Sequence, residues 1–208
     1  MKFILGTKQN MSQVFDEDGN VHPVTVISAS PVTVTDIKSA EGKDGYSAVQ
    51  VGYGEKSLNK MNKAERGHLG KKLGVKARGF KYLREFRVND EPVLNIGDSV
   101  DLSAFTEGEK VTVSAISKGK GFQGVIKRHG FHGGPRSHGQ KHSERAPGSI
   151  GAGGRQGVMK NMRMAGRMGS DRVTIKNLEL VKIDKDNNLV LISGAVPGRR
   201  GTLVEIYN

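Results

Sequence analysis

The sequence predicts a mainly β protein, with a folded body from which one long, irregular and basic segment extends. Three observations lead to this prediction. Short runs that alternate β-branched and polar residues recur along the chain, with few helical patterns between them. Residues 118–172 show neither a strand nor a helix periodicity. The net charge of +12 is concentrated in two segments and is not spread evenly over the 208 residues.

Strand-like runs define the body. They are expected at residues 24–28, 32–37, 111–117, 173–180, 189–196 and 202–207. Turn-forming residues at 16–19 (DEDG) and 184–188 (DKDNN) indicate hairpins. Strands that follow one another with few intervening helices favour an antiparallel barrel, closed or nearly closed, over a parallel sheet with crossover helices.

Charge separates the body from two basic segments. Residues 1–53, 89–117 and 173–208 carry net charges of −2, −5 and +1, and we assign them to three parts of the barrel. Residues 54–88 carry +8 and are assigned to a basic insertion, whereas residues 118–172 carry +10 and are assigned to an extended finger. Because like charges repel unless a counter-surface neutralises them, we expect a polyanionic partner.

The basic insertion is expected to contain one short helix. Asn62 can cap its N-terminus, and Glu65 stands at the spacing of a capping box. Gly67 and Gly70 are expected to keep the helix short. We expect the insertion to wrap the barrel and to face the polyanion, and an ordinary charged surface excursion is the alternative. Its candidate contact residues are Lys71, Lys72, Lys76, Arg78, Lys81 and Arg84.

Residues 118–172 contain 14 glycines, 12 Lys or Arg, four of the six histidines and two carboxylates. A stretch of this length without regular structure is either functional or disordered. We expect it to become ordered by threading into folded RNA, where phosphates neutralise the cations and glycine allows close approach of the backbone. DNA readers usually present a recognition helix or a zinc finger, and neither pattern occurs here. A free disordered loop would have the same composition.

The candidate RNA-contacting residues fall into two groups. Those expected to neutralise phosphates are Lys118, Lys120, Lys127, Arg128, Arg136, Lys141, Arg145, Arg155, Lys160, Arg163, Arg167 and Arg172. Those expected to stack on bases or to hydrogen-bond to them are Phe122, His129, Phe131, His132, His138 and His142. Residues 147–155 are the candidate tip, because their glycines allow tight threading.

Composition excludes several kinds of site. The absence of cysteine rules out a disulfide scaffold, a Cys-ligated zinc site, an iron–sulfur cluster and a thiol nucleophile. No apolar run approaches the roughly 18 residues that a membrane helix needs. The N-terminus lacks the features of a secretory signal. We therefore expect no membrane partner.

Two patterns point to other chemistry. Gly119-x-Gly121-x-x-Gly124 fits the dinucleotide fingerprint and follows a strand, but we expect no helix after it because Gly130 interrupts the next run. The four histidines have no cysteine and only one carboxylate nearby, which favours RNA contact over a metal site. We expect no cofactor, no metal, no small-molecule substrate and no catalysis. The open alternatives are an enzyme with a nucleotide cofactor and a free basic RNA binder.

Motifs along the whole chain resemble one known family, ribosomal protein three of the large subunit in its bacterial form. The opening ILGTKQNMSQVF (4–15) and the closing LVLISGAVPG (189–198) fit this family. The most specific block comprises GKGFQGVIKRHGF (119–131), GPRSHG (134–139), APGSIGAG (146–153) and MAGRMG (164–169). Thr112 departs from the family's usual Asp or Asn. Ala152 stands where some members carry a methylated Gln, so that modification is not carried over.

The resemblance implies a six-stranded barrel of the kind found in translation factors, located on the solvent side of the large subunit. It also implies an extension that runs through rRNA toward the peptidyl-transferase centre. Direct and early binding to large-subunit rRNA, nucleation of assembly and contact with neighbouring ribosomal proteins belong to the same expectation. A cytoplasmic location in the ribosome and a structural, non-catalytic role follow from it.

Overall fold

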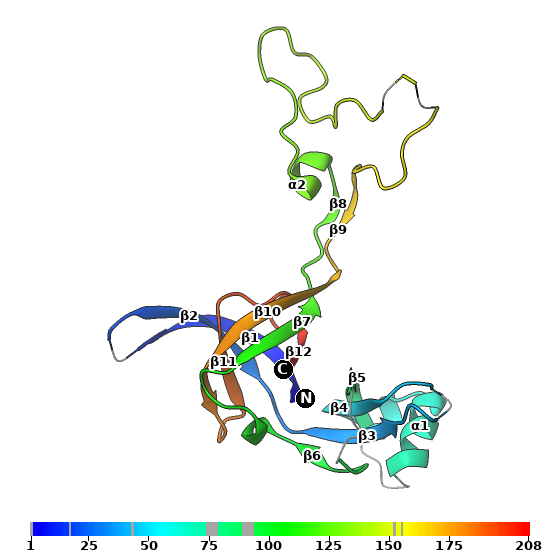
Figure 1. The fold of residues 1–208 in the computed structure, drawn as a ribbon, viewed down its shortest axis with the longest axis vertical. Helices are drawn as coiled ribbons and strands as arrows, with labels where there is room; N and C mark the ends of the chain where they lie inside the picture. The colour runs from blue at the N-terminus through cyan, green and yellow to red at the C-terminus, as the bar shows by residue number, and fades with distance from the viewer. Residues whose placement is uncertain are drawn as a thin grey trace. The chain divides into compact units, whose positions relative to one another are not determined.

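The structure is a computed structural model, and its chain divides into two compact units (Figure 1). We call the first unit, residues 1–116 and 173–208, the body, and the second, residues 117–172, the arm. The described residues form twelve β-strands, two α-helices and two short 3-10 turns, which confirms the prediction of a mainly β protein. The structure describes residues 2–16, 18–42, 44–73, 79–88, 94–151, 153–154 and 156–208.

Six strands of the body close into a barrel. In their order around the barrel these are β1 (Phe3–Phe15), β12 (Leu203–Tyr207), β7 (Lys110–Ile116), β10 (Arg172–Asp184), β11 (Leu189–Ser193) and β2 (Val21–Ser28). The first and last strands of the chain pair directly and antiparallel, with Phe3 opposite Tyr207 and Thr7 opposite Leu203. Closure gives each of these strands a neighbour on both sides, so none is left as a free edge.

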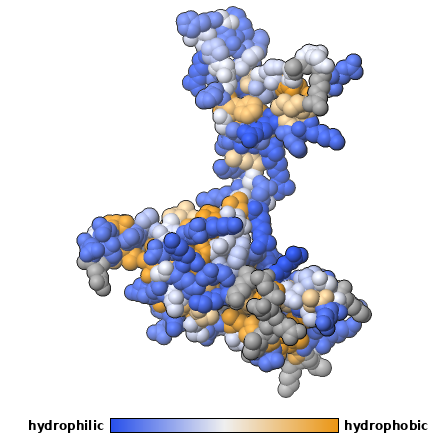
Figure 2. All heavy atoms as spheres, in the orientation of Figure 1, coloured by the Kyte–Doolittle hydropathy of each residue, from blue (hydrophilic) through white to orange (hydrophobic). Residues whose placement is uncertain are grey.

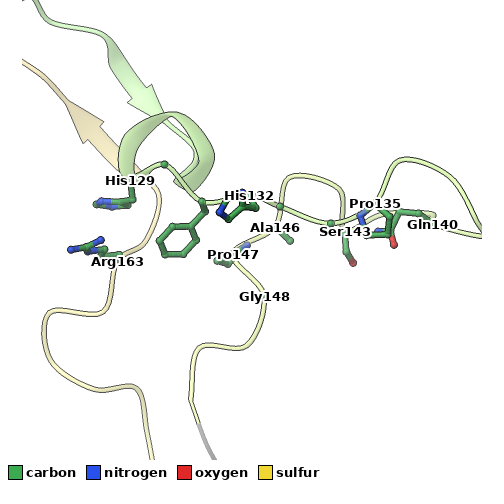
Figure 3. Close-up of a pocket in the computed structure, with 13 residues that line it drawn as sticks. His129, His132, Pro135, Gln140, Ser143, Ala146, Pro147, Gly148 and Arg163 are labelled. Atoms are coloured by element: carbon green, nitrogen blue, oxygen red, sulfur yellow. The ribbon is translucent and has the colours of Figure 1, made fainter.

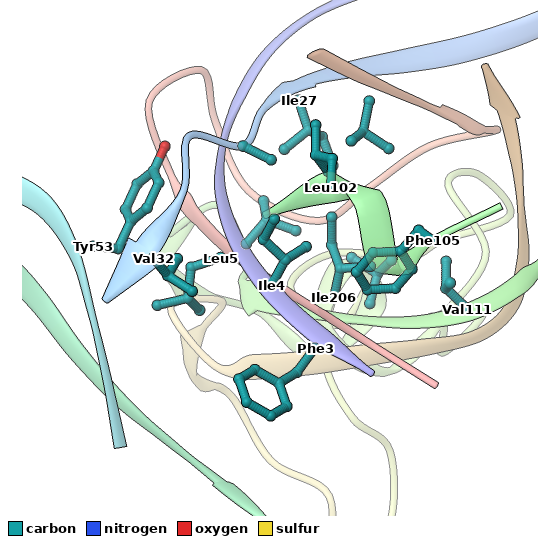
Figure 4. Packing of buried hydrophobic residues seen from close by; sticks show 14 of the residues in the cluster. Phe3, Ile4, Leu5, Ile27, Val32, Tyr53, Leu102, Phe105, Val111 and Ile206 are labelled. Carbon is teal, nitrogen blue, oxygen red and sulfur yellow. The ribbon is translucent and has the colours of Figure 1, made fainter. Parts of the chain in front are cut away.

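The core of the barrel is formed by side chains that alternate along its strands. Ile4, Ile27, Val113, Ile192 and Ile206 each come from a different strand and are at most 1% exposed. Figure 4 shows several of these side chains converging on the barrel interior. Full burial of one aliphatic side chain contributes about 1.5–3 kcal/mol, so this cluster is the main source of the body's stability.

Four further strands form a second sheet in the body. Their order is β5 (Gly79–Arg87), β4 (Ala48–Lys56), β3 (Val32–Lys38) and β6 (Ser99–Val100). Strand β3 confirms the strand expected at residues 32–37, but it belongs to this sheet and not to the barrel. Strand β5 lies inside the segment 54–88 that we expected to be an insertion around the barrel. An alternating pattern identifies a strand without identifying its partner, which explains the placement of β3, whereas β5 was not recognised as a strand because the charge of its segment indicated an insertion.

The second sheet and the barrel share one core. The rings of Phe3 in β1 and Phe86 in β5 stack with centroids 4.6 Å apart. The Tyr53 hydroxyl of β4 donates to the backbone carbonyl of Ser28 in β2 at 2.9 Å. Arg84 of β5 donates from Nε to Oε1 of Glu205 in β12 at 2.8 Å. The body is therefore a single packed unit and not a barrel with a loose excursion.

Helix α1 (Lys63–Leu73) follows the 3-10 turn η1 (Leu58–Lys60). The expected cap is confirmed, because the Asn62 side chain accepts from the backbone N–H of Glu65 at 2.7 Å. The expectation that Gly67 and Gly70 would shorten the helix was wrong, since both lie inside its eleven residues. Each faces open space, so the missing side chains leave no packing defect. Neither described helix is long and apolar enough to span a membrane.

Both expected hairpin turns are present. The Asp16 carboxylate accepts from the backbone N–H of Asn20 at 2.7 Å in the connection between β1 and β2. The Asp184 carboxylate accepts from the backbone N–H of Asn187 at 3.0 Å between β10 and β11. These side-chain bonds to nearby backbone are the reason that Asp and Asn mark turns in the sequence.

Candidate nucleic-acid interface

The two ends of the arm run side by side as a short antiparallel stem. Strand β8 (Gly121–Gln123) pairs with β9 (Gly166–Met168). Nearer the two ends of the arm, two backbone hydrogen bonds of 2.9 Å continue this pairing. The N–H of Lys120 donates to the carbonyl of Met168, and the N–H of Ser117 donates to the carbonyl of Asp171. Three-residue strands are too short to give a periodic signal, so this stem was not predictable from the sequence.

Gly169 allows the stem to close. Its φ of +79° lies in the left-handed region, and a Cβ atom there would stand 2.1 Å from the backbone oxygen of Lys118. Any side chain at position 169 would therefore force the two ends of the arm apart. A glycine that looks like one of many in this segment has a specific steric role.

Helix α2 (Val125–His129) is fixed to the returning chain by two of the candidate RNA contacts. Arg128 donates from Nη1 to the backbone carbonyl of Met164 at 2.8 Å, and Nε2 of His129 lies 3.0 Å from the same oxygen. A Cβ at Gly166 would stand 2.6 Å from Nη1 of Arg128. These two side chains therefore hold the arm's own fold, a role that the sequence analysis did not assign to them.

Helix α2 corrects one expectation about the pattern Gly119-x-Gly121-x-x-Gly124. A helix does follow it, with Gly124 at its N-cap and Gly130 at its C-cap. This helix has only five residues, however, and the preceding strand β8 pairs antiparallel with β9. A dinucleotide site needs a full crossover helix between parallel strands, so the pattern does not build one in this arm.

Ten of the arm's basic side chains are exposed. Arg128 is half-buried, and Arg155 lies outside the described residues. The arm also has little core of its own, since Val125 is its one apolar side chain that is buried among the described residues. On the face seen in Figure 2 its surface is mainly hydrophilic. The exposed cations are Lys118, Lys120, Lys127, Arg136, Lys141, Arg145, Lys160, Arg163, Arg167 and Arg172.

Internal neutralisation in the arm is small. One Glu144 oxygen accepts from Nε of Arg136 at 2.7 Å, and the Arg136 side chain is still 84% exposed. The carbonyl of Glu144 also accepts from the backbone N–H of Gly134 at 2.9 Å, which ties two turns of the arm together. The arm's only other carboxylate belongs to Asp171, at the stem. Most of the positive charge is thus presented to the surroundings.

The candidate cations of the body fall into two classes. Lys71 and Lys81 are exposed. Lys72 lies 2.8 Å from the buried Asp36 carboxylate, and Arg84 is bonded to Glu205. Carboxylates therefore compensate the charges of Lys72 and Arg84, which makes them weaker candidates for phosphate contact than their sequence positions indicated. Lys76 and Arg78 lie outside the described residues.

The arm contains a pocket of about 830 Å³ (Figure 3). Three of the expected base-contacting residues, His129, Phe131 and His132, line it, together with Arg163. The other lining residues were not predicted to form a pocket, although two of them fall in the expected tip, because irregular Gly- and Pro-rich turns have no periodicity from which to infer contacts. They are Gly130, Gly133, Gly134, Pro135, Gln140, Ser143, Ala146, Pro147 and Gly148.

The remaining candidate aromatic and histidine residues do not line this pocket. Phe122 lies on the stem with 77% of its surface exposed, a high value for an apolar side chain. His138 and His142 are exposed on the outer turns of the arm. Among the described residues, no group of three or more His, Cys, Asp or Glu side chains is placed to hold a metal ion.

Comparison with known proteins gives one consistent result. The family model described as ribosomal protein L3 matches residues 85–189. The large ribosomal subunit protein uL3 of Herpetosiphon aurantiacus is 50% identical over 204 residues, which cover 98% of this chain and 94% of that protein. The uL3 proteins of Finegoldia magna and Carboxydothermus hydrogenoformans are 50% and 48% identical, over 99% of this chain and 97% and 96% of their own lengths.

Proposed function

This chain belongs to the ribosomal protein L3 family, and from that membership we propose that it binds large-subunit rRNA directly through its arm. The family membership makes it a protein of the large ribosomal subunit, and thus part of a ribonucleoprotein that acts in translation. Its role there is structural.

One observation carries the proposal of direct rRNA binding. Ten exposed Lys and Arg side chains stand on a unit of 56 residues that has two carboxylates and almost no apolar core. RNA phosphates would neutralise these charges, and release of counterions from the RNA would drive binding. The glycines would let the backbone approach the RNA closely. Exposed Phe122 adds a ring on which a base can stack.

The family resemblance supports finer proposals. We propose that the barrel, of the kind found in translation factors, sits on the solvent side of the subunit and that the arm runs through rRNA toward the peptidyl-transferase centre. Residues 147–155 are the proposed tip. We further propose that binding occurs early and nucleates subunit assembly in the cytoplasm, and that the body contacts neighbouring ribosomal proteins. No membrane and no small-molecule substrate take part.

A deletion variant tests the rRNA-binding proposal. Ser117 and Asp171 are joined by a backbone hydrogen bond, so a short Gly-Ser link can replace residues 118–172 without stretching the body. We expect this variant to keep the circular-dichroism spectrum of a folded β protein and to lose most affinity for large-subunit rRNA. For the full chain, we expect log affinity to fall with log salt by about 0.7–0.9 per phosphate contacted. Unchanged affinity after the deletion would refute the proposal.

A tethered cleavage reagent tests the proposed path of the arm. Because the sequence has no cysteine, Ser149→Cys introduces a unique attachment point in the proposed tip. An iron chelate on this thiol should cleave rRNA around the peptidyl-transferase centre in reconstituted subunits. The matched control is Lys185→Cys in the exposed turn of the body, which should cleave elsewhere. The same cleavage pattern from both positions would contradict the proposed path.

A further inference from the structure

We infer that the pocket of the arm receives one unstacked nucleobase of the RNA chain. This inference rests on the proposed rRNA binding and names the chemical group that the site would hold. It assigns one ligand to the whole pocket, whereas the sequence indicated only individual residues that were expected to contact RNA. The ligand is a base within a polynucleotide and not a free nucleotide.

The lining chemistry suits a nucleobase. Phe131 offers a flat apolar face, and the imidazole rings of His129 and His132 combine a flat ring with polar nitrogens. Aromatic and imidazole rings are the groups on which splayed RNA bases stack. The described lining includes no carboxylate, and its one permanently charged group is Arg163. A cationic group at an otherwise neutral pocket favours a ligand that carries a phosphate beside an aromatic ring.

The walls leave room for a planar group. Four glycines line the pocket, namely Gly130, Gly133, Gly134 and Gly148, so much of its surface is bare backbone. Bare backbone can lie against a flat ring and can present N–H and C=O groups to its edge. A volume of about 830 Å³ falls within the range of ~300–1,000 Å³ that is usual for ligand sites. An inorganic ion or a single water molecule would leave such a space largely unfilled.

One imidazole and the guanidinium lie at one end of the pocket, whereas Gln140 and Ser143 lie at the other end. Figure 3 shows His129 and Arg163 together at the first end, with His132, Ala146 and Pro147 farther along. Since the Met164 carbonyl can only accept, Nε2 of a neutral His129 carries the hydrogen and Nδ1 is an acceptor. This arrangement places a guanidinium, a group that binds phosphate, beside a ring whose orientation is held by a hydrogen bond, as recognition of a base with its adjoining phosphate requires.

Two backbone hydrogen bonds and one side-chain hydrogen bond hold the walls in place. The N–H of Gly130 donates to the carbonyl of Ile126 at 2.9 Å, and the N–H of Gly134 donates to Glu144 at the same distance. The bond from Nε2 of His129 to Met164 joins the outgoing and returning chains. A pocket whose walls are already connected loses less conformational entropy on binding than a loop that must fold around its ligand.

The test uses large subunits reconstituted with the full chain and chemical probing of the Watson–Crick edges of their rRNA. Phe131→Leu removes the aromatic face and keeps apolar volume, whereas Phe131→Tyr keeps the ring. Val158→Ala is the control, because Val158 is an exposed apolar residue of the arm that does not line the pocket. We expect one nucleotide to be protected in the wild type, in Phe131→Tyr and in Val158→Ala, and to become about fivefold more reactive in Phe131→Leu.

The other outcomes are distinguishable. If the arm's footprint persists in Phe131→Leu with no nucleotide changed, the pocket holds no base, although the arm binds rRNA. If the whole footprint disappears, Phe131 maintains the arm's fold and the inference is wrong. If the wild type leaves no footprint at all, the proposed function itself fails. Equilibrium dialysis of the free full chain with AMP, GMP, CMP and UMP completes the test, since saturable binding that Phe131→Leu abolishes would identify a free-nucleotide site and overturn the inference.

Discussion

The guanidinium of Arg84 and the carboxylate of Glu205 form a hydrogen-bonded ion pair that joins the second sheet to the barrel. The Glu205 side chain is largely buried, whereas Arg84 is partly exposed. Removing the arginine would leave a carboxylate with little access to water and without this partner, and that costs more than the pair itself contributes. Arg84, which the sequence indicated as an RNA contact, therefore joins the two sheets of the body.

We expect Arg84→Ala to lower the free energy of unfolding by about 1–3 kcal/mol, because it removes a hydrogen-bonded charge partner from Glu205. Urea denaturation of Arg84→Ala, Glu205→Gln and the double variant measures the coupling between the two side chains. Arg136→Ala is the matched control, since its pair with Glu144 is much more exposed and should contribute at most about 1 kcal/mol. Equal effects of the two arginine variants would contradict the structural role of Arg84.

We expect Gly169→Ala to open the stem of the arm. The left-handed φ alone costs a side chain about 1–2 kcal/mol, and the contact with the Lys118 carbonyl adds to this cost. Amide hydrogen exchange at Ser117 and Lys120 should become at least about tenfold faster, while the melting temperature of the body stays unchanged. Gly151→Ala is the control, because a Cβ at Gly151 meets open space without a positive φ. Unchanged protection in Gly169→Ala would show that the stem tolerates a side chain.

Exposed cations of the arm and compensated cations of the body should differ in their effect on RNA binding. We expect Lys141→Gln to reduce the slope of log affinity against log salt by about 0.7–0.9, the contribution of one phosphate contact. Arg84→Gln, measured under conditions where the body stays folded, should leave the slope unchanged, because Glu205 already neutralises that charge. Titrations of large-subunit rRNA binding across a range of salt concentrations measure both slopes. A lower slope for Arg84→Gln would show that Arg84 does contact an RNA phosphate and would contradict this expectation.

Stability should fall in acid through Glu109. Hydrogen bonds from Asn208 and from Lys2 lower the pKa of this carboxyl from its ordinary 4.5 to about 2. Because the folded state has the lower pKa, the stabilisation is complete above the unfolded pKa of about 4.5 and is lost as the pH falls toward about 2. Urea denaturation at a series of pH values should show that the difference in free energy of unfolding between wild type and Glu109→Gln becomes smaller over this range. Glu179 is an exposed residue of β10, and the difference in free energy of unfolding between wild type and Glu179→Gln should not show this pH dependence.

The strands of the barrel were predictable where side chains alternate, as in residues 24–28 and 111–117. The partner of each strand was not, because pairing depends on contacts between distant parts of the chain. Strand β3 illustrates the difference, since its residues were recognised as a strand but placed in the wrong sheet. Charge counting located the segment that forms the arm, and the pattern of Asn62 and Glu65 located the helix cap.

The internal structure of the arm was beyond the sequence analysis. Its stem depends on two three-residue strands and on a glycine whose role is visible only against the Lys118 carbonyl. Arg128 and His129 have the residue types of an RNA contact, and nothing in the sequence indicates that both reach the Met164 carbonyl. Side-chain type predicts what a residue can bind, whereas the partner that it finds depends on the fold.

The pairing of β1 with β12 has a consequence for the synthesis of this protein. The strand at residues 3–15 leaves the translating ribosome well before its neighbour at residues 203–207 is made. Almost 190 further residues must therefore be translated before β1 can pair with β12. Until then β1 and β7 both lack a partner on one side, so a prematurely released fragment would expose two unpaired strand edges to other chains.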